Sequence, residues 1–272
     1  MIRGATRIAG VIGWPVTHSR SPEMFAAAFA AAGLDAAMIP IGVPPEDLVP
    51  AVAGLRAMRM LGASVTAPHK LAVAALCDRL SDAARAIGAV NCLQIDGAAL
   101  VGHNTDSAGF GDGLREAGCT PGHAVLLGAG GAARAVAYGL RVAHASSVEV
   151  IARRPQQVGW ITARPWTPLE LRGSFLRADL VVDATPAGLA EGDAAMIDTL
   201  PLDVLRPSTW VSSLIYHRRT TLLERAAKRG LATVDGRGML VHQGARAFAI
   251  WTSTAPPIHA MQRALDAAIL GT

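Results

Sequence analysis

One lysine in the first half of the chain has an amine that can exchange a proton, in a protein whose other cations are almost all arginine. Lys70, in the segment SVTAPHK (64–70), is one of only two lysines among 25 cationic residues. An arginine keeps its proton in proteins, whereas a lysine can release it. Lys228, in ERAAKRG (224–230), has no comparable polar context and is interpreted as a solvated surface cation. The sequence therefore predicts a proton donor or acceptor at position 70.

Other polar residues of the same half fall at expected strand ends and turns. They occur in the segments HSRSP, SVTAPHK, GAVNC and GHNTD, at Ser19, Ser21, Thr66, Asn91, Asn104 and Asp106. Each has a structural explanation of its own, such as a helix cap for Ser21 or a turn for the asparagines. Together, at the carboxyl ends of parallel strands, they match the place where open α/β sheets bind ligands.

The elements that must hold these residues are short apolar runs that alternate with helical segments. Strands are predicted at 7–14, 36–43 and 62–65, and a β-hairpin at 90–104 around the turn DGA. This alternation predicts a mostly parallel α/β sheet. Pro68 suits the first turn of a helix, so we expect Lys70 near the N-terminal end of a helix.

A second α/β unit follows in the sequence. Its predicted segments, each with an apolar strand, are 123–140, 147–155, 179–186 and 209–216. Residues 240–250 and 257–270 have apolar faces at helical spacing and are predicted to follow it as helices. The predicted fold class is therefore α/β, with two domains.

A glycine loop connects a strand to a helix in the segment VLLGAGGAARA (125–135). In the pattern Gly128-x-Gly130-x-x-Ala133, the first glycine permits a tight turn and the second lets a diphosphate approach the backbone. The N–H groups of the helix start, at Gly131 and Ala132, would bind phosphate oxygens. A glycine-rich turn without a ligand is the alternative, and the strand–loop–helix–strand context favours the nucleotide site.

Two arginines stand where a fold of this kind that binds NAD usually has an acidic residue for the ribose hydroxyls. The strand VEVIA (148–152) is followed directly by Arg153 and Arg154. Arginine pairs with phosphate oxygens, and an acidic residue would repel them. We therefore predict NADP, with its 2′-phosphate, as the cofactor. NAD is the alternative cofactor, and an exposed pair of helix-capping arginines is the structural alternative.

Composition argues against several other classes of protein. Aromatic residues make up only 4% of the chain and the net charge of +4 is spread along it, so no nucleic-acid partner is expected. No apolar run has the ~18–20 residues of a membrane span. Three cysteines without CxxC spacing suit a reducing compartment, and the histidines show no metal-ligand spacing. We expect a cytoplasmic protein with no membrane partner and no metal.

At these motifs the sequence resembles the shikimate dehydrogenase family, including its quinate-specific relatives. The resemblance covers essentially the whole chain: HSRSP, SVTAPHK, GAVNC, GHNTD and the glycine loop, then DATPAGL, Tyr216 and GRGMLVHQGARAF. It implies an N-terminal, mostly parallel α/β substrate domain and a Rossmann-type nucleotide-binding domain. By motif placement we assign residues 1–106 plus 239–272 to the substrate (catalytic) domain and 107–238 to the NADP-binding domain.

The resemblance also implies a function, the reversible reduction of 3-dehydroshikimate to shikimate by hydride transfer with NADPH, in aromatic amino acid biosynthesis through chorismate. Carried over onto this sequence, Lys70 is the general acid/base paired with Asp106. The implied binding residues are Ser19, Ser21, Thr66, Asn91, Tyr216 and Gln243 for the substrate, and Gly128, Gly130, Gly131, Ala132, Arg153, Arg154, Thr185 and Met239 for the cofactor. Among them, the two serines would hold the substrate carboxylate. Met239 and Gln243 are four residues apart, so one helical face would carry both.

The sequence departs from the family pattern near several of these motifs. Ser64 and Asp183 stand where the family has Asn, and Ser213 stands where it has Asp. Three hypotheses stay open. In the first, the chain is an NADP-dependent shikimate dehydrogenase. In the second, it is a paralogue that acts on quinate or an aminoshikimate, and the main version of this hypothesis is an NAD-dependent quinate dehydrogenase. In the third, it is a nucleotide-binding regulator without activity. For the enzyme, we expect a small-molecule substrate and a monomer or a homodimer.

Overall fold

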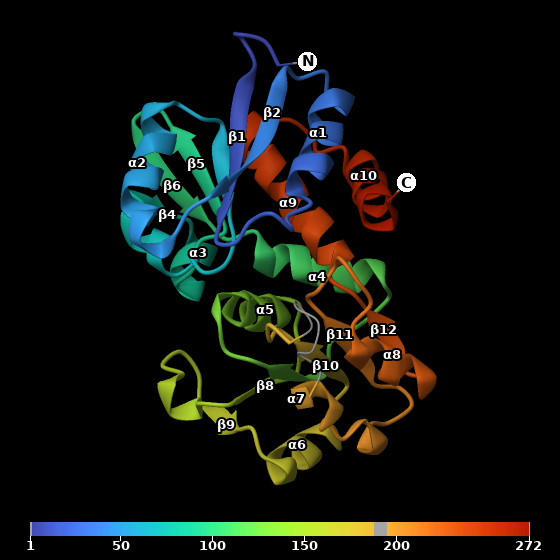
Figure 1. Cartoon of the computed structure of the whole chain (residues 1–272). Coiled ribbons are helices and arrows are strands. Elements are labelled where there is room, and N and C mark those ends of the chain that lie inside the picture. The colour runs from blue at the N-terminus through green and yellow to red at the C-terminus, as the bar shows by residue number, and fades with distance from the viewer. Residues whose placement is uncertain (1, 188–194, 272) are drawn as a thin grey trace. The chain divides into compact units, whose positions relative to one another are not determined.

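The computed structural model describes residues 2–187 and 195–271. The chain divides into two compact units, and each is described by itself (Figure 1). The first unit combines Met1–Gly109 with Val241–Thr272, and the second is Phe110–Leu240. The domain boundaries expected from motif placement, 106/107 and 238/239, lie a few residues before these positions.

The first unit begins with alternating strands and helices and continues with a hairpin. Its elements are β1 (Arg7–Gly13), α1 (Ser21–Ala31), β2 (Ala36–Gly42), η1 (Pro45–Asp47), α2 (Leu48–Ala57), β3 (Gly62–Val65), η2 (Ala72–Leu76), β4 (Arg79–Leu80), α3 (Asp82–Ile87), β5 (Cys92–Asp96), β6 (Ala99–His103), the start of α4 (Asp106–Glu116), most of α9 (Arg237–Thr252) and α10 (Ile258–Leu270). The three predicted strands are confirmed as β1, β2 and β3, and the predicted hairpin as β5 and β6.

The sheet of the first unit has the strand order β2-β1-β3-β5-β6-β4. β1 pairs in parallel with β2 and β3, whereas β5 pairs antiparallel with β3 and β6. β3 and β6 therefore run in the same direction, and both end at the sheet edge where β5 begins. This edge carries the segments that follow β3 and β6.

Residues from both ends of this unit's sequence share one hydrophobic core. α1 packs against α10 (Figure 1). Phe25 of α1 contacts Trp251 of α9 with ring centroids 5.1 Å apart, and Phe29 contacts Phe248 at 5.7 Å. The three phenylalanines are almost completely buried. The helices after residue 240 therefore complete a core that the first helix begins.

The second unit is a parallel sheet with helices between its strands. Its elements are the rest of α4 and α9, then β7 (His123–Leu127), α5 (Gly131–Val142), β8 (Ser147–Ala152), η3 (Pro155–Gln157), β9 (Ala163–Pro165), α6 (Pro168–Phe175), β10 (Leu180–Asp183), α7 (Ala195–Asp198), η4 (Leu202–Val204), β11 (Trp210–Ser213), α8 (Thr221–Lys228) and β12 (Ala232–Val234). The strand order is β12-β11-β10-β7-β8-β9, and every pairing is parallel.

This order is that of a Rossmann fold, which confirms the predicted fold class. Counted from β7 as the first strand and read from the β9 edge, it is the order 3-2-1-4-5-6 of dinucleotide-binding sheets. Alternate residues of β7 enter different cores: Val125 and Leu127 pack with Phe175 of α6, whereas Ala124 and Leu126 pack with Val136 of α5. Both faces of the sheet are therefore covered, as a parallel sheet requires.

One local expectation is wrong. No α-helix follows β3, because residues 67–71 form turns and the 3₁₀ helix η2 comes next. The Lys70 carbonyl accepts a hydrogen bond from the N–H of Val90 at 2.8 Å, a tertiary contact in place of a helical one. Lys70 is therefore held by a neighbouring segment and not by the start of a helix.

Candidate active site

Lys70 and Asp106 form a hydrogen-bonded ion pair. Lys70 Nζ lies 2.6 Å from Asp106 Oδ2. The lysine side chain exposes 18% of its surface and the aspartate 5%, so the amine keeps access from outside while the carboxylate is buried. A charge-assisted bond of this length fixes the direction of the ammonium group. The pair can therefore present a proton donor whose position is set by the carboxylate.

The backbone brings this pair and Asn91 to one edge of the first sheet. Lys70 follows β3 and Asp106 follows β6, whereas Asn91 directly precedes β5, which runs the other way. Two backbone hydrogen bonds hold Asn91 at that edge. Val65 N–H donates to the Asn91 carbonyl at 2.7 Å, and Asn91 N–H donates to the His103 carbonyl at 3.0 Å. Three segments that are distant in the sequence thus meet at one point.

The side chain of Asn91 is the centre of a buried hydrogen-bond network. Its Oδ1 accepts the N–H of Thr105 at 2.7 Å, so its Nδ2 faces the other acceptors. Nδ2 donates to Asp106 Oδ1 at 2.8 Å and lies 2.9 Å from Thr105 Oγ1 and 3.3 Å from Gln243 Oε1. Sequence reasoning missed Thr105, whose only signal is its place between Asn104 and Asp106. This network holds the second oxygen of Asp106 while Lys70 holds the first.

Gln243 reaches the network because a glycine lets two helices approach closely. A Cβ on Gly109 of α4 would lie 2.6 Å from the backbone nitrogen of Gln243 on α9, so no larger residue fits there. Gln243 is buried, and its Oε1 lies within hydrogen-bond distance of Asn91 Nδ2 and Thr105 Oγ1. The network therefore joins four of the predicted site residues: Lys70, Asp106, Asn91 and Gln243.

Cys92 lies beside this network as a fully buried thiol. Burial, as the larger cause, and the charge of Asp106 raise the pKa of Cys92, whereas its hydrogen bond with Trp251 lowers it. The net increase keeps the thiol protonated at neutral pH. Cys92 therefore adds neither a nucleophile nor a second negative charge next to Asp106.

Three further hydroxyls predicted to bind the substrate belong to the same unit but form no hydrogen bond with the network. Ser21 is the first residue of α1, not its cap, and its N–H donates to Ser19 Oγ at 3.3 Å. Thr66 follows β3, and a Cβ on Gly13 would collide with its Cγ2. None of the three hydroxyls donates to a residue in the part of the chain that the structure describes. All three can therefore donate to a ligand.

Ser64 is a buried serine on β3, the strand that Thr66 follows. It lies opposite Cys92 in the β3–β5 pairing and two residues before Thr66, so all three side chains share one face of the sheet. Ser64 exposes 7% of its surface, and its Oγ has no hydrogen-bond partner among residues 2–187 and 195–271. An unpaired buried hydroxyl is costly, so a ligand or water that bonds to Ser64 would be favoured.

In the second unit, the glycine loop follows β7, which pairs with β10 at the point where the strand order of the sheet reverses. Gly128 has a φ of +102°, which residues with a Cβ rarely adopt, and a Cβ there would lie 3.1 Å from Ala184 O. Gly130 caps α5 without a side chain, and a Cβ on it would meet nothing within 4 Å. The backbone at Gly130 is thus open to a ligand, next to the unbonded N–H groups of Gly131 and Ala132. This arrangement fits a phosphate group.

Asp183 is a buried carboxylate that fixes Thr185 beside this loop. Asp183 Oδ1 accepts the N–H and the Oγ–H of Thr185 at 2.9 and 2.6 Å. Burial raises the pKa of Asp183 to about 6, although both hydrogen bonds lower it. A Cβ on Gly128 would lie 3.4 Å from Thr185 Cγ2, so the two residues are neighbours. Asp183 is therefore a further residue of this site, which sequence reasoning noted only as a departure from the family pattern.

The two arginines predicted to bind the 2′-phosphate lie at the end of β8. Arg153 and Arg154 are exposed, and neither forms an ion pair with any residue in 2–187 or 195–271. β8 pairs in parallel with β7, so both strands end at the same edge of the sheet. Two guanidinium groups without a carboxylate partner fit a phosphate ester better than a ribose diol.

Two predicted residues of the second unit have contacts of their own. Met239 is partly buried against the core around Phe110 and Leu114, and the Tyr216 ring lies edge-on to His217 at 5.7 Å between centroids. Their contacts with cofactor and substrate stay predictions.

Two kinds of feature are absent from the described part of the chain. No group of three or more His, Cys, Asp or Glu side chains there could hold a metal ion. No helix in residues 2–187 and 195–271 is both long enough and apolar enough to cross a membrane.

Sequence comparison relates both ends of the chain to one family. The sequence model of the shikimate dehydrogenase substrate binding domain matches residues 11–93, and that of the shikimate 5'-dehydrogenase C-terminal domain matches residues 236–265. A shikimate dehydrogenase (NADP(+)) of Citrifermentans bemidjiense is 42% identical over 98% of this chain and 97% of its own length.

Solved structures show the same relation. Shikimate 5-dehydrogenase from Thermus thermophilus, in complex with NADP(H) and shikimate, has a TM-score of 0.85 and 34% identity, covering 97% of this chain and 100% of its own. Quinate dehydrogenase from Corynebacterium glutamicum, in complex with NAD, has a TM-score of 0.85 at 28% identity, covering 96% of this chain and 99% of its own. The fold and the sequence agree over nearly the full length, and the chain belongs to the shikimate dehydrogenase family.

Proposed function

We propose that the protein is an NADP-dependent shikimate dehydrogenase, which reversibly reduces 3-dehydroshikimate to shikimate by hydride transfer. The observation that carries the proposal is the 2.6 Å bond between Lys70 Nζ and Asp106 Oδ2, held by Asn91 at the edge of the sheet. A buried carboxylate and a partly exposed amine at this distance form a positioned proton donor. The named activity of the C. bemidjiense relative supports the substrate and the cofactor.

The chain's own residues account for the proton transfer. Reduction of a ring ketone develops negative charge on its oxygen, which needs a nearby donor. The Lys70 ammonium gives its proton to that oxygen, and in the reverse direction the neutral amine takes it back from the hydroxyl. Asp106 keeps the amine aimed, because Asn91 holds its other oxygen. Ser19, Ser21 and Thr66 supply hydroxyl donors for the substrate carboxylate and ring hydroxyls.

The second unit supplies residues that fit NADP. When bound, NADPH supplies the hydride. The open backbone at Gly130 and the N–H groups that follow it would hold the diphosphate, and Arg153 and Arg154 would hold the 2′-phosphate. Thr185, fixed by Asp183, and Met239 complete the proposed set. These residues bind the cofactor and take no part in the proton transfer.

A second candidate, a paralogue that acts on quinate, is favoured by Ser64. Its Oγ is buried without a partner in residues 2–187 and 195–271, on the sheet face that also carries Thr66. Quinate has one more ring hydroxyl than shikimate, and an unpaired serine hydroxyl could bind it. Pocket differences of this size change discrimination by only ~1–3 kcal/mol, so Ser64 alone does not outweigh the relative's named activity.

A kinetic panel tests both candidates, with shikimate, quinate and an amino analogue each measured against NADP and NAD. We expect the highest kcat/KM for shikimate with NADP. A preference for quinate, or for NAD, would replace the first candidate by the second. If no pair is turned over while NADPH still binds in calorimetry, the chain is a nucleotide-binding regulator and the dehydrogenase assignment is wrong.

A further inference from the structure

Trp160 links two loops of the second unit through a hydrogen bond. It lies in the 155–163 segment, which begins with η3, ends at the first residue of β9 and directly follows Arg153 and Arg154. Its indole Nε1–H donates to the carbonyl oxygen of Ala129, at 3.3 Å. Ala129 is the residue between the first two glycines of the glycine loop. One side chain therefore connects the loop expected to hold the diphosphate with the segment that directly follows the arginines expected to hold the 2′-phosphate.

Arg134 supports the indole from the first turn of α5. Its guanidinium carbon lies 5.8 Å from the centroid of the Trp160 ring, within the range of a cation–π contact. Arg134 Nε is buried and has no hydrogen-bond partner in the described ranges, and no carboxylate there pairs with the group. The charge of Arg134 is therefore held against the ring and is not neutralised by those residues. It adds to the positive field at the start of α5.

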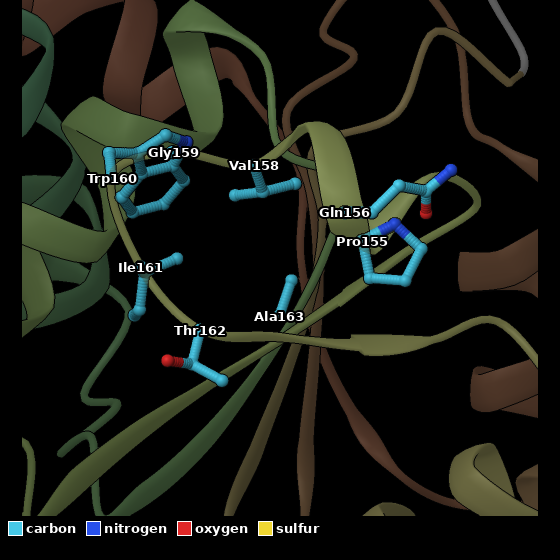
Figure 2. Close-up of a pocket in the computed structure, with 8 residues that line it drawn as sticks. All are labelled: Pro155, Gln156, Val158, Gly159, Trp160, Ile161, Thr162 and Ala163. Carbon is cyan, nitrogen blue, oxygen red and sulfur yellow. The ribbon is translucent and has the colours of Figure 1, made fainter.

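The 155–163 segment packs on the core of the second unit through Trp160, Ile161 and Ala163. It also lines an open hollow of about 540 Å³, and Figure 2 shows Val158, Ile161 and Ala163 beside it, with Trp160 to one side. The short helix η3 is the only regular structure between β8 and β9. Of these residues, Trp160 is the one whose side chain also bonds to the glycine loop, so it couples the position of the segment to the position of that loop.

We propose that Trp160, supported by Arg134, is a positioning residue for NADP, which sets the distance between the glycine loop and the arginine pair. This inference rests on the proposed NADP dependence. Trp160 acts through the Ala129 carbonyl and through the 155–163 segment. Both phosphate sites must be occupied at once by one molecule, so an error in their separation weakens binding of the whole dinucleotide. The proton-transfer network of the first unit does not use Trp160.

Binding measurements on single variants test the proposal. Trp160→Phe keeps the ring and removes the N–H, and Trp160→Ala removes both. We expect the Kd of NADPH, measured by its fluorescence, to rise about five-fold in Trp160→Phe, as loss of one neutral hydrogen bond implies. In Trp160→Ala it should rise about ten-fold or more. The KM for NADPH should follow the Kd, while kcat at saturating NADPH and the KM for shikimate stay unchanged.

The matched control is Trp166→Phe, which changes another partly buried tryptophan of the same unit that packs against a different core. We expect it to alter thermal stability without altering the Kd. A double-mutant cycle adds Arg134→Met, whose effect on the Kd should be smaller in Trp160→Ala than in the wild-type protein.

The possible failures are distinguishable. Trp160→Phe and Trp166→Phe with equal effects on the Kd would overturn the positioning role while leaving the proposed function intact. So would a loss of thermal stability in Trp160→Phe with no change in the Kd. A wild-type protein that oxidises shikimate with NAD but does not bind NADPH would overturn the NADP dependence and this inference with it.

Discussion

Asn91 Nδ2 donates a hydrogen bond of 2.8 Å to the Asp106 oxygen that does not face Lys70. Each carboxylate oxygen of Asp106 therefore has its own donor, and the carboxylate cannot rotate without losing one of them. Because Asn91 is itself fixed by backbone bonds to β3 and β6, the position of the proton donor is set by the sheet. The direction of the Lys70 amine thus depends on a residue that carries no charge.

Asn91→Ala should reduce both stability and turnover. It leaves the N–H of Thr105 and one oxygen of Asp106 without their partner, at a cost of about 1–3 kcal/mol in the free energy of unfolding. A displaced Asp106 should lower kcat by about ten- to a hundred-fold. Urea titration and steady-state kinetics measure the two effects. Asn104→Ala is the control, because within the described residues the Asn104 side chain bonds only to the Ala89 carbonyl and the Ser107 N–H, so this variant should lose stability and keep its kcat. Equal losses of kcat in the two variants would contradict the assigned role.

Lys70→Arg should be nearly inactive although it keeps the positive charge. Arginine does not release its proton, so turnover should fall by about a hundred-fold or more, as removal of a general acid does. The pair with Asp106 can still form, so the KM for shikimate should change little. Lys228→Arg is the matched control, since Lys228 is the other lysine of the chain and is exposed on α8. If Lys70→Arg turned over shikimate as fast as Lys228→Arg does, Lys70 would not be the proton donor.

Replacement of Arg153 and Arg154 by alanine should change which cofactor the protein prefers. Two charge-assisted hydrogen bonds to a phosphate, at about 1.5–3 kcal/mol each, account for a loss of a hundred-fold or more in NADPH affinity. NADH lacks the 2′-phosphate, so its affinity should be almost unaffected. Calorimetric titration with both cofactors measures the difference. Arg141→Ala, which removes an exposed arginine from the last turn of α5, serves as the control. Parallel losses for NADPH and NADH would argue against a 2′-phosphate site.

Asp183→Asn should stabilise the protein at neutral pH but not in acid. Burial raises the pKa of Asp183 from 3.8 to about 6, so the folded protein binds this proton more tightly than the unfolded chain does. Stability from this group is therefore highest below pH ~4, falls as the pH rises to ~6 and stays low above that. Asn keeps an oxygen that can accept both bonds from Thr185. We expect Asp183→Asn to unfold with a free energy higher by on the order of 2 kcal/mol at pH 7.5.

Chemical denaturation across pH 4 to 8 tests this expectation. Asp203→Asn, which removes an exposed carboxylate of the same unit, is the control. A gain in Asp183→Asn that is as large in acid as at neutral pH would have to arise from packing, and the burial argument would then be wrong.

The sequence predicted the elements well wherever an apolar run decides them. β1, β2 and β3 lie within the predicted strands. β1 and β3 are largely buried parallel strands and are apolar on both faces, whereas β2 is a partly exposed edge strand that its apolar run still marks. The segment after β3 was predicted less well, because the Lys70 carbonyl accepts a hydrogen bond from the N–H of Val90. Local sequence patterns do not predict such a tertiary contact. Thr105 was missed for a similar reason, since its role depends on an asparagine from another strand.

In the second unit, too, the sequence predicted local motifs but not roles that depend on tertiary contacts. The glycine loop has a local signature, and its Gly128 has the positive φ that such a turn requires. Trp160 and Asp183 have no such signature, because what they do depends on the Ala129 carbonyl and on burial at the end of a strand. Residue type and spacing predicted which residues take part in the chemistry. The residues that position them could be identified only from their tertiary contacts in the structure.

The core of the first unit has a consequence for the synthesis of the protein. Phe25 and Phe29 leave the ribosome early, but Phe248 and Trp251, which cover them, leave it only after the whole second unit. Until then the apolar face of α1 lacks its permanent cover and is available to chaperones or to other nascent chains. The Rossmann unit, whose residues are continuous in the sequence, can fold first. The first unit is thus completed only after the second has been synthesised, and variants that slow its completion should aggregate during synthesis.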